Sequence, residues 1–305
     1  KPMASFGRLF PARRRTGLGL AVTASLAIGV GPRVCSLVAG PAMEAAAPAR
    51  RAIVTGGSSG IGAATVRGLL DRGYRVFTTG RSNEALAKLQ SEVAERRGPA
   101  ASQEVLRTSV GDVAEEADVA RQMQEALDFF GGDVDAAVLN AGCAAGRHLL
   151  EDLPVEAFDR VMRTNVRGVM LWTQAVLRVM KPQKRGQIVV TSSAAAMRAC
   201  PTAAVYAASK FAVQGLVLSV RAELKGTGVK IGTVNPGAVA TEWWLEEHRG
   251  GYSYSPDNEL EKKEKLTFWN SMLSPQAVAD AILSLVEQPA SSNIESLVLD
   301  PSDFG

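Results

Sequence analysis

The chain has 305 residues, of which 46% are apolar, so it is long enough to bury the core of one large α/β domain. Its formal charge is +3, but six of the 34 basic residues and only one of the 31 acidic residues lie in residues 1–48. The rest of the chain is slightly negative, which argues against a general nucleic-acid-binding surface. The cysteines, Cys35, Cys143 and Cys200, have neither a disulfide nor a metal-ligand spacing. We therefore expect no metal site and a reducing compartment.

Residues 1–48 differ in composition from the rest of the chain. They are rich in Ala, Gly, Arg and Ser, and Arg13–Arg15 precedes an uncharged run over Thr16–Pro32. This composition is typical of a transit peptide for an organelle, a plastid or a mitochondrion. Two alternatives stay open: a signal peptide for export, and a disordered leader without a targeting role, which would leave the protein cytoplasmic. The run is short and Gly-rich for a spanning helix, so we expect no firm membrane span.

Residues 49–305 predict one domain in which short β-rich runs alternate with longer amphipathic stretches. The expected strands are Ala52–Thr55, Arg75–Thr79, Val105–Ser109, Ala136–Leu139, Gln187–Thr191, Lys230–Val234 and Ser296–Leu299. The expected helices are Ile61–Asp71, Glu84–Arg96, Ala117–Phe130, Pro154–Met180, Thr202–Lys225 and Pro275–Glu287. Strict alternation predicts parallel strands with right-handed crossovers, a Rossmann-like doubly wound α/β sheet. Ligands of such sheets bind at the carboxyl ends of the strands.

A glycine-rich loop follows the first expected strand. It reads Thr55-Gly56-Gly57-Ser58-Ser59-Gly60-Ile61-Gly62 and leads into the first helix. Glycines at positions 56, 60 and 62 permit a tight turn and a close approach of the backbone to a pyrophosphate. The helix N-terminus adds free N–H groups and a partial positive charge. Although an ordinary strand–helix loop could have this composition, its place in an alternating chain predicts a dinucleotide site.

The end of the second expected strand indicates which dinucleotide binds. This segment reads Thr79-Gly80-Arg81-Ser82 and contains no acid. A cofactor whose ribose carries only hydroxyls is usually held by an acid at this point. A guanidinium suits the 2′-phosphate of NADP(H), so Arg81 favours that cofactor. The alternative is a solvated arginine that opens the next helix.

A candidate acid/base follows the fifth expected strand. Tyr206 and Lys210 are four residues apart, which places them on one helix face, and Ser193 lies thirteen residues before Tyr206. A nearby ammonium and a cationic nicotinamide are expected to lower the pKa of the phenol. The Ser193 hydroxyl can hold a substrate oxygen while Tyr206 exchanges the proton. Ser192 is the competing assignment for Ser193.

Residues 242–273 contain a cluster of aromatic side chains. They are Trp243, Trp244, Tyr252, Tyr254, Phe268 and Trp269. One hypothesis is that some of these rings form an apolar wall for a bulky hydrophobic substrate. The alternative is that they pack this insertion onto the body of the protein or onto a partner subunit.

From Arg51 to Gly305 the chain resembles the short-chain dehydrogenase/reductase family, in its roughly 250-residue subtype. The resemblance implies a catalytic tetrad of Asn165, Ser193, Tyr206 and Lys210, in which Asn165 holds a water linked to the lysine. Asn165 could instead only cap or kink its helix. Many relatives have Asn at the position of Leu139, a difference expected to affect sheet packing rather than catalysis.

The resemblance also implies the cofactor contacts. The family places an acid near the adenine, an Asn-Ala-Gly motif after the fourth strand, and a segment that holds the nicotinamide carboxamide after the sixth, although Thr241 could instead begin the lid. The expected contacts are Gly56, Ser58, Ser59, Gly60, Ile61, Gly62, Arg81, Asp112, Val113, Asn140, Ala141, Gly142, Tyr206, Lys210, Pro236, Gly237, Val239 and Thr241.

We therefore expect an NADP(H)-dependent enzyme that transfers a hydride between nicotinamide and a small-molecule carbonyl or alcohol. The family implies a homodimer or homotetramer, with 242–273 as a lid over the substrate. Two other functions stay open: a non-catalytic nucleotide-binding scaffold that keeps the fold, and a sugar-nucleotide epimerase. An epimerase, however, is expected to be longer and to space its glycines differently.

Overall fold

The computed structural model describes residues 49–242 and 269–302, and the statements below concern these residues. Seven strands form one sheet in which every pair of neighbours is parallel. They are β1 (Arg51–Thr55), β2 (Arg75–Gly80), β3 (Leu106–Val110), β4 (Ala136–Leu139), β5 (Gly186–Thr191), β6 (Val229–Pro236) and β7 (Ser296–Leu299). The strand order is β3-β2-β1-β4-β5-β6-β7. The chain thus reverses direction across the sheet between β1 and β4, and the expected doubly wound fold is confirmed.

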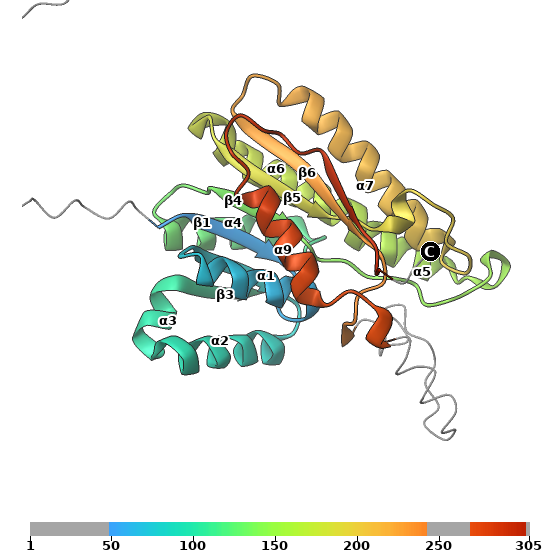
Figure 1. Ribbon diagram of the computed structural model, residues 1–305, viewed down its shortest axis with the longest axis horizontal. Helices are drawn as coiled ribbons and strands as arrows, with labels where there is room; N and C mark the ends of the chain where they lie inside the picture. The colour runs from blue at the N-terminus through green and yellow to red at the C-terminus, as the bar shows by residue number, and fades with distance from the viewer. Residues whose placement is uncertain (1–48, 243–268, 303–305) are drawn as a thin grey trace, which may run out of the picture. The chain divides into compact units, whose positions relative to one another are not determined.

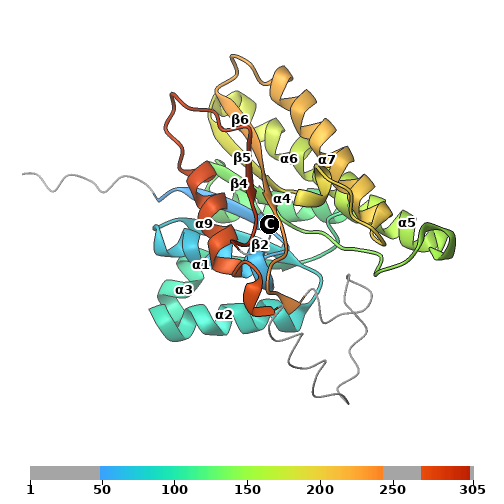
Figure 2. The same ribbon diagram turned by 45° about the vertical axis from the view of Figure 1, so that its right-hand side comes forward.

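Helices cover both faces of the sheet (Figures 1 and 2). They are α1 (Gly60–Asp71), α2 (Asn83–Arg97), α3 (Pro99–Val105), α4 (Glu116–Phe130), α5 (Val155–Met162), α6 (Gly168–Gln183), α7 (Ala204–Glu223) and α9 (Pro275–Val286). Short turns of 3₁₀-helix, η1 (Leu150–Asp152) and η3 (Ala194–Ala196), precede α5 and α7. Ser82 and Ser274 cap α2 and α9, because each hydroxyl accepts a hydrogen bond from the N–H three residues later.

The core has two parts, one on each face of the sheet. Alternate residues of one strand enter different parts: Ile53 packs with α4, α6 and α7, whereas Val54 packs with α1, α2 and α9. Trp172 of α6 is the largest fully buried side chain of the first part. Leu139 is buried in the same part, where its side chain packs without needing a polar partner. Burial on both faces fixes the register of the strands, and hence the positions of the loops at their carboxyl ends.

The structure differs from the sequence-based prediction in two helices. Gly98 has a positive φ of 85° and Pro99 follows at the first helical position, so a short additional helix, α3, precedes β3. The helix expected over Pro154–Met180 is interrupted by a π-helical turn, η2 (Arg163–Arg167). Asn165 lies in this turn and is completely buried.

Candidate active site

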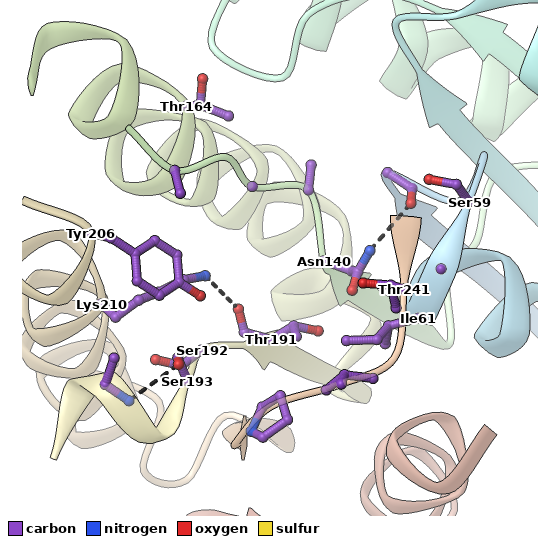
Figure 3. Close-up of a pocket in the computed structure, with 18 of the residues that line it drawn as sticks. Ser59, Ile61, Asn140, Thr164, Thr191, Ser192, Ser193, Tyr206, Lys210 and Thr241 are labelled. Carbon is purple, nitrogen blue, oxygen red and sulfur yellow. Dashed lines mark hydrogen bonds between the residues drawn. The ribbon is translucent and has the colours of Figure 1, made fainter. Parts of the chain in front are cut away.

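A cavity of about 590 Å³ opens at the carboxyl ends of the strands (Figure 3). It collects residues from the loops that follow β1, β2, β3, β4, β5 and β6. The predicted residues that line it are Gly56, Ser58, Ser59, Gly60, Ile61, Arg81, Asp112, Val113, Asn140, Ala141, Gly142, Ser193, Tyr206, Lys210, Pro236, Gly237, Val239 and Thr241. Gly62 and Asn165 do not line the cavity. Both are buried behind it, where they support its wall.

The glycine loop forms one end of the cavity. Gly56 and Gly60 have positive φ values of 67° and 52°, which favour glycine. A Cβ on Gly62 would lie 2.1 Å from the Gly56 carbonyl oxygen, so only glycine fits there. The side chain of Ser59, the N-cap residue of α1, caps no backbone N–H, which leaves the first N–H groups of α1 without a partner inside the helix. This arrangement can bind an anionic phosphate.

Thr55 and Asn140 hold the loops after β1 and β4 together. The Thr55 hydroxyl accepts hydrogen bonds from the backbone N–H groups of Asn140 (3.0 Å) and Ala141 (3.2 Å). In return, the Asn140 amide donates to the Gly56 carbonyl at 3.2 Å (Figure 3). The Asn140 side chain therefore holds the backbone of the glycine loop in place.

Arg81, which is expected to select the cofactor, and Asp112, which is expected to lie near the adenine, also line the cavity. Arg81 is exposed on the cavity rim, and within the described ranges it makes no hydrogen bond or ion pair. Asp112 accepts a hydrogen bond from the Ala114 N–H at 2.9 Å and lies 3.6 Å from the guanidinium of Arg163. Arg81 is thus available to an anion, whereas Asp112 already has partners.

Tyr206 and Ser193 face each other at the opposite end of the cavity (Figure 3). The Ser193 hydroxyl lies within hydrogen-bonding reach of Tyr206, an interaction that lowers the pKa of the phenol. Ser193 also caps η3, because its Oγ accepts a hydrogen bond from the Ala195 N–H at 3.1 Å. The Ser192 hydroxyl is buried and makes no hydrogen bond within the described part of the chain. The contact with Tyr206 favours Ser193 over Ser192 as the partner of the phenol.

Lys210 lies one turn after Tyr206 and is only 5% exposed. Its Nζ donates to the carbonyl oxygen of Thr191 at 3.1 Å and lies 5.6 Å from the centroid of the Tyr206 ring. Burial lowers the pKa of the Lys210 ammonium to about 8. Burial also raises the pKa of Tyr206 to about 12, and the hydrogen bond with Ser193 lowers it only in part. In the protein alone, the shift for Tyr206 is therefore opposite to the expected one, because desolvation outweighs the favourable interactions.

Asn165 has a structural role that its position in the sequence did not predict. Its side-chain oxygen accepts from the Cys143 N–H and its amide donates to the Cys143 carbonyl, both at 2.8 Å. The same amide donates to the Ser209 hydroxyl at 3.0 Å. Asn165 thus ties the loop after β4 to α7, while its expected link to a water and the lysine stays a prediction.

The segment after β6 forms the wall opposite α7. Leu273, directly before α9, pairs with this segment: its N–H donates to Ala238, and its carbonyl accepts from Ala240, both at 2.9 Å. Of the expected aromatic cluster, Trp269 is described and is half-buried. Trp243, Trp244, Tyr252, Tyr254 and Phe268 lie outside the described residues, so both readings of residues 242–273 stay predictions.

Four further residues of the cavity wall had no signal in the sequence. Arg147 follows β4, Arg198 and Cys200 lie between η3 and α7, and Asp300 follows β7. They lie on loops without a recognisable motif, and only the parallel arrangement of the strands brings them together. A search for loop residues directly after each expected strand would have found Asp300.

The profile of the short chain dehydrogenase family matches residues 50–249. The chain belongs to this family. It is thus an oxidoreductase, and the match covers the glycine loop, Ser193, Tyr206 and Lys210. Within the described residues, no group of acidic, His or Cys side chains could hold a metal ion, and no helix is long and apolar enough to cross a membrane.

Named members of the family are similar to this chain over most of their length. The 2-(R)-hydroxypropyl-CoM dehydrogenase of Xanthobacter autotrophicus is 39% identical over 203 residues, which cover 65% of this chain and 79% of the relative. An NADP-dependent 3-hydroxy acid dehydrogenase of Salmonella typhi is 29% identical over 82% of this chain and 94% of the relative. The structure resembles an alcohol dehydrogenase of Thermococcus sibiricus complexed with 5-hydroxy-NADP, with a TM-score of 0.68, 28% identity and coverage of 83% and 97%.

Proposed function

We propose that this oxidoreductase uses NADP(H) and interconverts a carbonyl group and an alcohol, with Tyr206 as its acid/base. The observation that carries the proposal is that Ser193 faces Tyr206, one turn from Lys210, in a cavity whose other end is the glycine loop (Figure 3). The NADP-dependent relative and the structural neighbour complexed with 5-hydroxy-NADP support the cofactor.

The residues of the cavity fit this cofactor. The unpartnered N–H groups at the start of α1 would hold the pyrophosphate, and Arg81 would hold the 2′-phosphate. Asp112 and Val113 would border the adenine. The centre of the cofactor would lie against Asn140, Ala141 and Gly142. Lys210 would hold the ribose, and the segment Pro236–Thr241 would hold the carboxamide. When bound, NADPH supplies the hydride.

Ser193 and Tyr206 act on the substrate oxygen. The Ser193 hydroxyl donates a hydrogen bond that positions this oxygen and stabilises developing negative charge. Tyr206 donates its proton to the same oxygen. Because burial raises its pKa to about 12, the phenol is protonated at neutral pH and ready to act as an acid.

The variant Tyr206→Phe tests this assignment. It removes the proton donor and leaves the ring, so turnover of NADPH with a panel of ketones and quinones should fall by about 10²- to 10⁴-fold. NADPH binding, measured by fluorescence titration, should stay within a few-fold of the wild type. Retention of more than a tenth of the wild-type rate would contradict the role of Tyr206. Absence of turnover in the wild type would instead favour a nucleotide-binding scaffold.

The expected oligomer is also part of the proposal. Phe158 of α5 and Phe211 and Leu218 of α7 are exposed apolar side chains of the helices beside the cavity. Such side chains support self-association through these helices, as a homodimer or homotetramer.

A further inference from the structure

An ion pair between Arg198 and Asp300 borders the substrate end of the cavity. The Arg198 Nη2 lies 2.5 Å from each carboxylate oxygen of Asp300. Arg198 follows Ser193 by five residues, and Asp300 lies against Gly237, where an added Cβ would be 2.5 Å from its Oδ1. The pair therefore lies beside Ser193 and the segment after β6, away from the phosphate loop.

The position of Arg198 is set by the loop that carries it. This loop, residues 197–203, is held by the segment after β4: Arg147 donates to the Pro201 carbonyl at 3.1 Å and to the Thr202 hydroxyl at 3.2 Å. The His148 N–H donates to the Thr202 carbonyl at 2.9 Å. These contacts join the loop to the segment after β4 at the cavity wall, which Arg198 lines.

The charges at this end of the cavity favour an anionic ligand. Arg81 and Asp112 are the charged lining residues expected near the adenosine. Of the other described charged residues that line the cavity, Arg147, Arg198 and Lys210 are basic, and Glu242 and Asp300 are acidic. One positive charge is thus in excess. The side chains of Arg198 and Asp300 are 54% and 33% exposed, and an ion pair this accessible to water contributes little to stability. An incoming oxyanion can therefore replace Asp300 at small cost.

We propose that Arg198 binds a carboxylate, or a comparable oxyanion, of the substrate in exchange for Asp300. The proposal rests on the function proposed above and gives it a substrate class: a carbonyl compound that carries an acidic group. The planar guanidinium can bind both oxygens of this group through two N–H groups, whereas Asp300 contacts Nη2 alone. Released into water, Asp300 keeps its charge solvated.

The test uses pairs of probes that differ only in this charge. Acetoacetate and benzoylformate are compared with their methyl esters as substrates of the wild type, Arg198→Gln, Arg198→Lys and Asp300→Asn. We expect Arg198→Gln to lower the ratio of kcat/KM for acid over ester by about 10- to 100-fold, the value of a charge-assisted hydrogen bond. Arg198→Lys should recover part of the ratio, and Asp300→Asn should raise it. Arg96→Gln, on the exposed end of α2, is the matched control.

Calorimetric binding of benzoylformate and its ester, with and without NADP⁺, separates this proposal from the function on which it rests. If the wild type reduces no probe, the proposed function fails, and the binding preference for acid over ester still tests Arg198. If Arg198→Gln and Asp300→Asn each lower kcat/KM equally for acids and esters, the ion pair has only a structural role, and the proposal is overturned. So would an acid preference that survives Arg198→Gln.

Discussion

Lys210 and Tyr206 have pKa values shifted by the same cause in directions that both favour the neutral form. Lys210 is buried and Tyr206 is partly buried in the cavity wall, and removal from water disfavours whichever form is charged. The Lys210 ammonium therefore loses its proton more easily, and the Tyr206 phenol less easily, than in solution. A cationic or anionic group that enters the cavity changes this balance.

The shift at Lys210 predicts how stability depends on pH. Between about pH 8 and 10.5 the unfolded chain binds more protons at this side chain than the folded chain, so the free energy of unfolding rises with pH in this window. The wild type should gain about 2 kcal/mol relative to Lys210→Met between pH 7 and 9.5. Urea denaturation of both proteins at the two pH values measures this gain. If the difference in free energy of unfolding between the two proteins is the same at both pH values, Lys210 is not desolvated.

Arg81 tests the choice of cofactor. Its guanidinium has no partner within the described ranges, so Arg81→Ala should remove a contact with the 2′-phosphate and little else. A charge-assisted hydrogen bond of about 1.5–3 kcal/mol implies a loss of about 10- to 150-fold in affinity for NADPH and no comparable loss for NADH. Fluorescence titration with both nucleotides makes the comparison. An equal loss for both would assign Arg81 a structural role.

At the scale of elements, the π-helical turn between α5 and α6 carries Asn165, whose side chain bonds to the loop after β4. The turn places a polar side chain in a fully buried position, where it satisfies both backbone groups of Cys143. Asn165→Ala would leave these groups without partners, at a cost of about 1–3 kcal/mol for each. We expect a free energy of unfolding lower by about 2–6 kcal/mol in urea denaturation. If stability is unchanged and only turnover falls, Asn165 acts in catalysis alone.

The sequence predicted the strands better than the helices for a physical reason. Apolar runs mark strands that are buried on both faces, and glycine or serine marks the ends of several helices. A π-helical turn has no comparable signal, because the contacts made from it join Asn165 to Cys143, which are 22 residues apart in the chain. The phosphate loop and the Tyr206–Lys210 pair lie within short segments and could be predicted. Arg147 and Arg198 lie on loops several residues beyond the strands and could not, whereas Asp300 directly follows an expected strand.

At the scale of the whole molecule, residues 1–48 are predicted to be dispensable for folding. Within the described residues, Arg50 already contacts the body: its guanidinium lies 2.7 Å from Glu287, and its carbonyl accepts from the Arg75 N–H at 2.8 Å. A chain that starts at Ala49 should keep its turnover and melt within about 3 °C of the full chain, a shift that corresponds to about 1 kcal/mol. Loss of soluble protein would contradict this independence. The proposed organellar address is tested by fusing residues 1–48 to a fluorescent reporter, for which a diffuse cytosolic signal would be the contrary result.

The burial of the central strands has a consequence for how the molecule opens. Every residue of β4, and all but the first of β1 and β5, is buried, so their amides should exchange with solvent only when the whole domain unfolds. The loop with Arg198 is held by a few exposed contacts and can open locally at a much smaller free energy. Local fluctuations can therefore widen the entrance beside Ser193 and leave the β-strand floor of the cavity intact. Ligand entry and global stability thus depend on different contacts, so a change at the entrance can alter one with little effect on the other.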